Sequence, residues 1–294
     1  MSDGDSNRIT REYFESILIE TRHIDACVPD LSVRYFGESF SMPIATAALS
    51  HLNNASENGM RDMAEGARLA GALCFSGMAE RDELEAMCGT GAKVVKIIKP
   101  HADNAEVLRR IRDAEECGCF AVGMDIDHAF NGAGGYDDVC GYAMRPKSSD
   151  ELRSFINATK LPFVIKGVLS TYDAQKALEV GAAGIIVSHH HGIMPYSVPP
   201  LMVLPEIAAA VASRMTIFAD CGFESGADVF KALALGADGV CIGRAIMPPI
   251  KDKGAEGCRE KLCCLADGLR GIMVRTAAAD VQSIDPSVIH LRRF

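Results

Sequence analysis

Short apolar segments alternate with longer amphipathic segments along most of this chain. The short segments are rich in valine, isoleucine, alanine and cysteine, as expected of parallel strands that are covered on both faces. Eight such strands are predicted, at Pro43–Ala47, Ala72–Ser76, Lys93–Ile98, Cys119–Asp125, Pro162–Lys166, Gly184–Ser188, Thr216–Asp220 and Gly239–Gly243.

The segments between these strands carry apolar residues every three or four positions, which is the spacing of helices with one buried face. They include Asn58–Ala70, Asn104–Cys117, Thr171–Val180, Leu201–Ala212 and Ala227–Leu235. Eight alternations of strand and helix favour an α/β fold with a single (β/α)8 TIM barrel over an open doubly wound sheet.

Two segments depart from this alternation. Residues 1–42 are a short polar and helical lead-in that is too small for a domain, and residues 43–294 are assigned to the barrel. Residues 128–147 are rich in glycine, lack periodicity and follow the fourth strand. We expect them to lie over the carboxyl-terminal end of the barrel (the mouth) as an active-site loop, and a plain mobile loop is the alternative.

The composition describes an ordinary globular protein. The chain has 294 residues, of which 48% are hydrophobic and 23% charged, and a net charge of −9. Without a block of lysines or arginines, nucleic acid and anionic membranes are not expected partners. A polar start and the lack of a membrane-spanning apolar run favour a cytoplasmic protein. The 11 cysteines form no CxxC pair, which favours reduced thiols over zinc ligands.

Three consecutive histidines, His189, His190 and His191, follow the sixth predicted strand. The carboxyl ends of barrel strands are where such enzymes place their chemistry. Imidazole is the side chain best suited to moving protons near neutral pH. We therefore expect a catalytic base among the three, and expect at least one of the others only to cap the strand.

Charged and glycine residues at other strand ends suggest further chemistry. Lys166 ends the fifth strand, where a buried lysine needs an anionic partner. It suits a Schiff-base nucleophile, a fixed charge beside an electron-accepting ring, or a structural salt bridge. The seventh predicted strand is followed by a turn that contains Gly222. The eighth ends at Gly243, directly before Arg244. Free backbone N–H groups beside an arginine are the usual phosphate site of barrel enzymes.

Four motifs together resemble one known family. They are Leu161–Val168, Gly181–Ser188 with the following His190, Gly226–Ala237, and Gly239–Arg244. In these motifs the chain is similar to the FMN-dependent α-hydroxy acid oxidase and dehydrogenase family, over about residues 28 to 294. The resemblance implies a (β/α)8 barrel that binds FMN at its mouth and an oxidoreductase that moves a hydride between substrate and flavin.

The resemblance also implies roles for individual residues. His190 is the expected acid–base group, with His191 as the alternative if the alignment shifts by one residue. Asp127 is expected to orient the histidine, and Lys166 to stabilise negative charge on the reduced ring. The implied cofactor-binding residues are Ala48, Leu49, Ser50, Ser76, Lys96, Asp125, Lys166, Ser188, Asp220, Gly222, Glu224, Gly243 and Arg244.

The substrate-binding positions depart from the family. Its two carboxylate-binding arginines correspond here to Phe130 and Ile193, and a tyrosine of the third strand corresponds to Ile98. A carboxylate without a bidentate partner is costly to bind. We therefore expect a pocket of Ile98, Phe130, His191 and Ile193 that takes an apolar or aromatic small molecule rather than a simple 2-hydroxy acid.

Two flavin-edge positions have also changed, to Lys96 and Asp125, and we expect these two residues to form an ion pair beside the ring. No metal site is expected. Alternative functions are an FMN-dependent isomerase of similar fold and a flavin-binding protein without catalysis. Because members of the family are commonly tetramers, a homo-oligomer is expected.

Overall fold

The computed structural model describes residues 4–52 and 56–292. Eight parallel strands close into a barrel in the order β10-β11-β12-β13-β4-β5-β6-β7. The strands are β4 (Ile44–Leu49), β5 (Cys74–Ser76), β6 (Val94–Ile98), β7 (Ala121–Asp125), β10 (Phe163–Val168), β11 (Gly184–Val187), β12 (Thr216–Ala219) and β13 (Gly239–Ile242). Each overlaps a strand predicted from the sequence, so the (β/α)8 prediction is confirmed.

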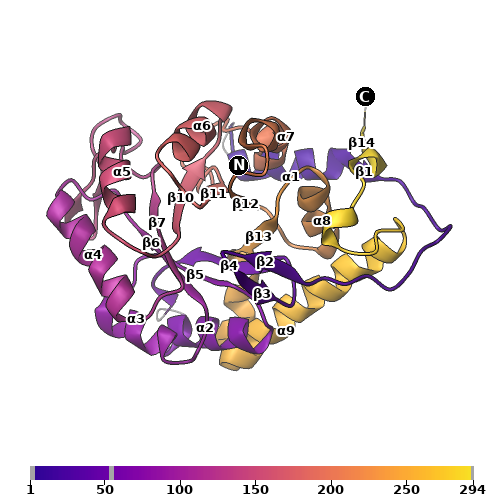
Figure 1. Cartoon of the computed structure of the whole chain (residues 1–294), viewed down its shortest axis with the longest axis horizontal. Coiled ribbons are helices and arrows are strands. Elements are labelled where there is room, and N and C mark those ends of the chain that lie inside the picture. Colours follow the sequence, from indigo (N-terminus) through magenta and orange to yellow (C-terminus); the bar gives the residue numbers. More distant parts are fainter. Residues whose placement is uncertain (1–3, 53–55, 293–294) are drawn as a thin grey trace.

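Helices surround the barrel in Figure 1 and cover the outer faces of its strands. In chain order they are α2 (Gly59–Leu69), α3 (Arg81–Cys88), α4 (Asn104–Glu116), α5 (Ser149–Asn157), α6 (Thr171–Glu179), α7 (Pro200–Val211), α8 (Gly226–Ala234) and α9 (Met247–Val274). The five helices predicted by residue range are all present. None of the helices in the described part of the chain is both long and apolar enough to cross a membrane.

Strand residues alternate between two apolar layers, as the pleat of a strand requires. One layer lies inside the barrel, and its buried residues come from the barrel strands, the position just before β5 and the β2–β3 segment (residues 33–40) rather than from the surrounding α-helices. The other lies between the strands and the helices. In β6, Val95 and Ile97 belong to the inner layer, whereas Val94 and Ile98 belong to the outer one. This alternation decides which side chains of β6 can reach the interior of the mouth.

A short hairpin packs on the inner layer of the barrel. It consists of β2 (Val33–Tyr35) and β3 (Glu38–Phe40). The Tyr35 ring lies 4.8 Å from the ring of Phe218 in β12, and its hydroxyl donates a hydrogen bond of 2.9 Å to the carbonyl of Asp238. The lead-in before the barrel therefore contributes to the core.

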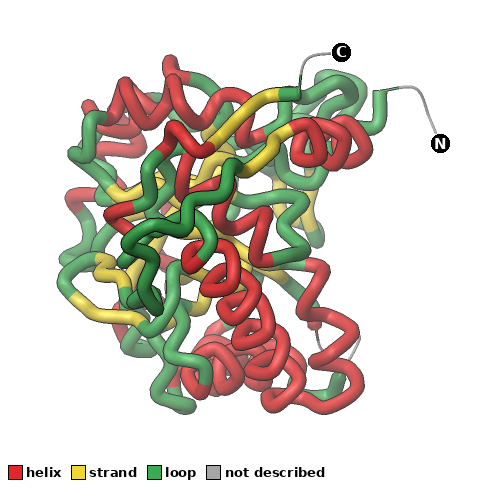
Figure 2. Tube along the Cα trace, turned by 90° about the vertical axis from the view of Figure 1, so that its right-hand side faces the viewer, coloured by secondary structure: helices red, strands yellow, loops and turns green. Residues whose placement is uncertain are grey.

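The two ends of the described chain meet. The helix α1 (Ser6–Ser16) leads into β1 (Ile17–Ile19), which pairs antiparallel with β14 (Ile289–Leu291). Both ends consequently lie on one side of the molecule (Figure 2).

The segment 128–147 is not wholly irregular, because it contains the two-residue strands β8 (Asp138–Val139) and β9 (Tyr142–Ala143). The described part of the chain also contains 3₁₀ turns at Arg244–Ile246, Val281–Ser283 and Pro286–Val288.

Candidate active site

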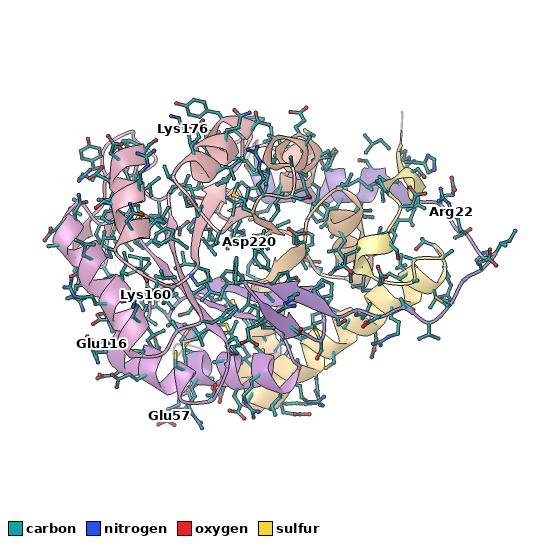
Figure 3. The ribbon with its side chains drawn as sticks, in the orientation of Figure 1. Arg22, Glu57, Glu116, Lys160, Lys176 and Asp220 are labelled. Atoms are coloured by element: carbon teal, nitrogen blue, oxygen red, sulfur yellow. The ribbon has the colours of Figure 1, made fainter. Side chains whose placement is uncertain are left out.

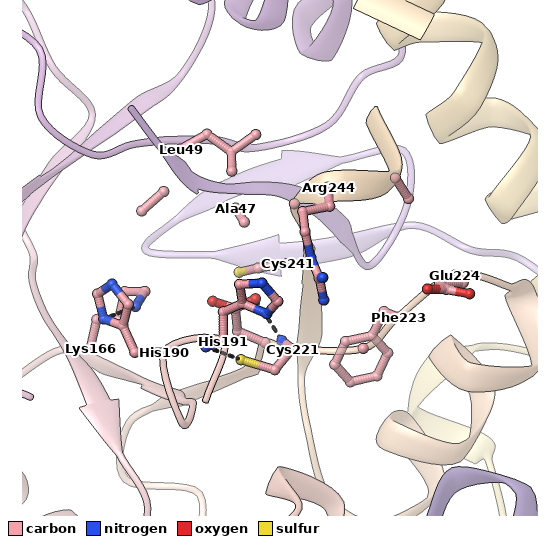
Figure 4. Close-up of a pocket in the computed structure, with 15 residues that line it drawn as sticks. Ala47, Leu49, Lys166, His190, His191, Cys221, Phe223, Glu224, Cys241 and Arg244 are labelled. Atoms are coloured by element: carbon pink, nitrogen blue, oxygen red, sulfur yellow. Dashed lines mark hydrogen bonds between the residues drawn. The ribbon is translucent and has the colours of Figure 1, made fainter. Parts of the chain in front are cut away.

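A cavity of about 330 Å³ opens at the barrel mouth. Asp220, which follows β12, lies near the centre of the molecule in Figure 3. Figure 4 shows Lys166 and His190 together at one end of the cavity, with Arg244, Phe223 and Glu224 at the other. The cavity is lined by Ala47, Ala48, Leu49, Lys166, His190, His191, Asp220, Cys221, Gly222, Phe223, Glu224, Cys241, Gly243, Arg244 and Ala245.

Four charged or titratable side chains meet beside the first end, where Lys166 and His190 line the cavity and Asp125 and Asp127 contact them without lining it. His190 Nδ1 lies 2.8 Å from Oδ1 of Asp127, 3.4 Å from Oδ1 of Asp125 and 3.4 Å from Nζ of Lys166. Lys166 and Asp125 are paired residues of the neighbouring strands β10 and β7, and their Nζ and Oδ1 atoms are 3.4 Å apart. The predicted pairing of Asp127 with His190 is therefore present.

The electrostatics of this cluster keep opposite charges together. Burial opposes ionisation of Asp125, but Lys166 and Lys99 outweigh it and hold the pKa of that carboxyl well below its ordinary value. Burial likewise opposes the charge on Lys166, and the two carboxylates raise its pKa in spite of it. Burial and the charge of Asp125 raise the pKa of Asp127. Against burial, hydrogen bonds to Asp125 and Asp127 raise the pKa of His190.

Gly167 leaves room for this arrangement. Its φ of +91° is in the left-handed region, and a Cβ atom at this position would lie 2.5 Å from Cγ of Asp127. Real Cβ atoms do not approach other carbon atoms so closely. A glycine immediately after Lys166 is therefore what allows Asp127 to stand beside His190.

The other two histidines have different surroundings. His189 is buried, and its Nε2 lies 2.8 Å from the hydroxyl of Thr10 in α1 while its Nδ1 accepts a hydrogen bond from the N–H of Gly192. His191 lines the cavity on the side of Arg244, and its ring contacts the side chain of Asn7. Neither forms an ion pair with a carboxylate in the described structure. Of the three histidines, His190 is thus the one that contacts carboxylates among the described residues.

The second end of the cavity has the features of an anion site. Arg244 lines it, and its Nη2 makes a long contact of 3.5 Å with Oδ1 of Asn7. The N–H groups of Gly222 and Phe223 have no acceptor among the described residues. Free N–H groups beside a guanidinium can hold a phosphate. The carboxylate of Glu224 also lines this end and works against an anion there.

The predicted ion pair between Lys96 and Asp125 is wrong. Lys96 donates instead to the carbonyls of Gly77 and Ala79. The register explains this difference, because Lys96 is level with Val122 of β7, three residues before Asp125. Lys96 also alternates with the interior residues of β6 and faces the helices, where burial and the charge of Arg110 lower its pKa to about 7. Lys96 is therefore not brought to the cavity.

Three predicted pocket residues also lie outside the cavity. Ile98 belongs to the apolar layer between strands and helices, for the same reason of alternation, so its placement in the pocket is wrong. Phe130 is 47% exposed and Ile193 is 39% exposed. Phe130 stacks on Tyr136 of the same loop, with ring centroids 5.6 Å apart. These two residues lie on loops after β7 and β11 but do not line the cavity.

Three predicted serines are not among the residues that line the cavity. Ser50 Oγ accepts a hydrogen bond of 2.7 Å from the N–H of Met78. Ser188 Oγ accepts one of 3.0 Å from the N–H of His190, so it shapes the turn that carries the histidine. Ser76 is buried and its Oγ has no hydrogen-bond partner within the described residues.

Sequence reasoning missed Lys99. Its Nζ lies 2.7 Å from Oδ2 of Asp125, and the two side chains are 11% and 4% exposed. The alternation of side chains along β6 could have predicted its position. Val95 and Ile97 point into the barrel, and position 99 continues that series. Oxygen and nitrogen atoms of Asp125, Asp127 and His190 lie within 4.8 Å of one another, but Lys99 and Lys166 already supply the positive charge that a metal ion would bring.

Comparisons with known proteins agree in sequence and structure. The family profile described as FMN-dependent dehydrogenase matches residues 1–151 and 137–291. Glycolate oxidase 3 of Arabidopsis thaliana is 29% identical over 93% of this chain and 84% of its own length. The 4-hydroxymandelate oxidase of Amycolatopsis orientalis is 28% identical over 81% of this chain and 76% of its own. A crystal structure of mandelate oxidase with (S)-2-phenylpropionate has a TM-score of 0.87 at 26% identity, over 98% of this chain and 90% of that one.

Proposed function

Since the chain belongs to the FMN-dependent dehydrogenase family, we propose that it moves a hydride between FMN and an apolar or aromatic donor other than a simple 2-hydroxy acid, with His190 as the acid–base group. The observation that carries this proposal is the hydrogen bond between His190 and Asp127 beside the buried ammonium of Lys166.

The cavity fits FMN at both ends. The side chain of Lys166 is 6% exposed, and it provides a fixed positive charge in the cavity wall. Arg244 and the free N–H groups of Gly222 and Phe223 suit a terminal phosphate. When bound, FMN supplies the hydride acceptor or donor, and its reduced ring carries negative charge that a nearby cation stabilises.

The histidine has one nitrogen left for the substrate. Nδ1 of His190 is engaged by Asp127, so Nε2 is the atom that takes the proton of a donor hydroxyl or returns it in the reverse direction. Asp127 fixes the ring and favours the imidazolium once it forms. Lys166 and Lys99 together balance the two carboxylates, which keeps the cluster close to neutral before the proton moves.

The proposed substrate class rests on what surrounds the cluster. Among the described residues, Arg244 is the one arginine that lines the cavity, and it lies at the end assigned to phosphate. Lys166 and Lys99 are the other nearby cations, and both are already paired with Asp125, at 3.4 Å and 2.7 Å. A carboxylate would therefore lack a bidentate partner of its own.

We also propose that the protein is a cytoplasmic homo-oligomer, with its barrel at 43–294 and an active-site loop at 128–147.

Anaerobic flavin bleaching tests this proposal. Protein loaded with FMN is mixed with aromatic and aliphatic alcohols, and with glycolate, lactate and mandelate as acids. We expect at least one uncharged donor to bleach the flavin stoichiometrically and faster than any of these acids. His190→Asn should lower the rate constant of bleaching about 10²- to 10⁴-fold while FMN stays bound. His290→Asn is the matched control, because His290 is exposed and pairs with Glu20.

Each other outcome selects a different function. Brisk bleaching by lactate would overturn the proposed substrate class. Turnover of an isomerisable substrate only after chemical reduction of the flavin would point to an isomerase. A protein that binds FMN but does neither would be a flavin-binding protein, and equal rates in His190→Asn and the native chain would remove His190 from the mechanism.

A further inference from the structure

Two thiols face each other outside the active-site cavity. Cys88 is the last residue of α3 and Cys119 lies two residues before β7. Their Sγ atoms are 3.7 Å apart, within the range of a sulfur hydrogen bond. Nothing in the proposed function uses this pair.

We propose that Cys88 and Cys119 form a reversible disulfide when a hydroperoxide oxidises the protein. In the first step the Cys88 thiolate attacks the peroxide, a sulfur–oxygen bond forms, the oxygen–oxygen bond breaks, and water or an alcohol leaves after protonation. In the second step the Cys119 sulfur attacks the Cys88 sulfenic acid, releases its proton and displaces water. Two electrons pass from the thiols to the peroxide.

The surroundings assign different roles to the two cysteines. Cys88 is half-buried, so a small peroxide can reach it, whereas Cys119 is 5% exposed. The hydrogen bond from Cys119 lowers the pKa of Cys88, which increases its thiolate fraction. The same contact and burial raise the pKa of Cys119. Cys88 is therefore the attacking thiol and Cys119 the resolving one.

Little movement is needed to close the bond. The sulfurs must approach from 3.7 Å to about 2 Å. The pair joins the end of α3 to the segment that enters β7, so small shifts of a helix end can supply the difference. This proposal does not depend on the proposed enzymatic function, because no group of the cavity takes part in it.

A neighbouring cysteine offers a matched control. Cys117 lies two residues from Cys119 and is also half-buried. Its Sγ lies 4.0 Å from the carbonyl of Arg81 and within hydrogen-bond distance of neither sulfur in the described structure. Cys117→Ser should therefore leave the disulfide unchanged, whereas Cys88→Ser or Cys119→Ser should abolish it.

The experiment exposes the reduced protein to a small excess of hydrogen peroxide and then digests it without reductant. The tryptic peptide that contains Cys119 also contains Cys117 and Cys140, so the digest uses the Cys117→Ser/Cys140→Ser background. We expect a cross-linked peptide pair that has lost two hydrogens and that dithiothreitol separates. In Cys119→Ser the cross-link should be lost, and a sulfenic-acid probe should label Cys88 instead.

Two results would overturn the proposal. One is oxidised protein in which the peptides of Cys88 and Cys119 remain separate and unmodified while exposed cysteines react. The other is labelling of Cys88 by the sulfenic-acid probe to the same extent with and without Cys119. If Cys88→Ser or Cys119→Ser is poorly folded, the Cys117→Ser/Cys140→Ser background alone tests the proposal. A cross-linked peptide pair that dithiothreitol separates supports it, and the lack of such a pair contradicts it.

Discussion

The ammonium of Lys99 lies 2.7 Å from Oδ2 of Asp125. The two residues stand at the carboxyl-terminal ends of the adjacent strands β6 and β7. The pairing follows from the register of β6 and β7, in which Ile98 is level with Met124. One step further along both strands brings positions 99 and 125 together. Asp125 thus has a lysine on each side, Lys99 from β6 and Lys166 from β10.

Lys99→Met should destabilise the protein by about 2–3 kcal/mol, because it removes one partner of a buried charge pair. The remaining contact with Lys166 keeps the loss at or below the lower end of the range for such pairs, which is about 3–5 kcal/mol. Urea unfolding at neutral pH measures the change. Lys93→Met is the control, since Lys93 and Glu38 form an exposed pair and should be worth at most about 1 kcal/mol. Equal losses in the two variants would contradict this account of Asp125.

The pH dependence of flavin bleaching should reflect the raised pKa of His190. A base must be neutral to accept a proton, so the rate constant should rise with pH, with a midpoint above the ordinary histidine value of about 6.5. Asp127→Asn removes a carboxylate that raises this pKa, so the midpoint should fall. We also expect about a 10- to 100-fold lower plateau, because the ring loses its orienting partner. An unchanged midpoint would show that Asp127 does not act on the catalytic base.

Gly167→Ala should disturb the site without touching a charged residue. The new methyl group would displace Asp127 and lower the bleaching rate constant by at least about tenfold, as a small misplacement of catalytic groups does. Gly118→Ala is the matched control, because Gly118 also has a positive φ, of +77°, but open space around the position of a Cβ atom. It should cost only about 1 kcal/mol of stability. Stopped-flow bleaching of the two FMN-loaded variants separates the effects.

The affinity for FMN should depend on opposite charges at one end of the cavity. Arg244→Met should weaken binding about 10- to 100-fold, the value of a charge-assisted hydrogen bond to phosphate. Glu224→Gln should tighten it about two- to fivefold by removing an exposed carboxylate from the same end. Quenching of FMN fluorescence measures both constants. Arg153→Met, which removes an exposed arginine paired with Asp150 on α5, should have no effect.

The barrel could be predicted because its signal is repeated in every strand. A run such as Val94–Ile98 is buried on both faces, and the composition of such a run reports that burial directly. The strand ends placed three histidines at the mouth, and the family resemblance then singled out His190 and its partner Asp127. Arg244 was placed in the same way.

The errors have a common physical cause. Lys96 was assigned to the flavin edge and Ile98 to the substrate pocket by alignment with the family. A shift of one residue in a strand moves a side chain from one face of the sheet to the other. The contact between α1 and the mouth could not be predicted either. It joins Thr10 to His189 across 179 positions, and no local pattern in the sequence reports such a distance.

The helix α1 closes one side of the mouth from outside the barrel. It contacts His189 through Thr10 and His191 through Asn7, while Arg11 forms two hydrogen bonds with Asp228 at the start of α8. A chain cut back to its first barrel strand would therefore keep its eight strands but lose the wall against which two of the three histidines rest. Residues of the lead-in thus form part of the wall of the mouth. A functional assay of a chain without them would therefore test an incomplete site.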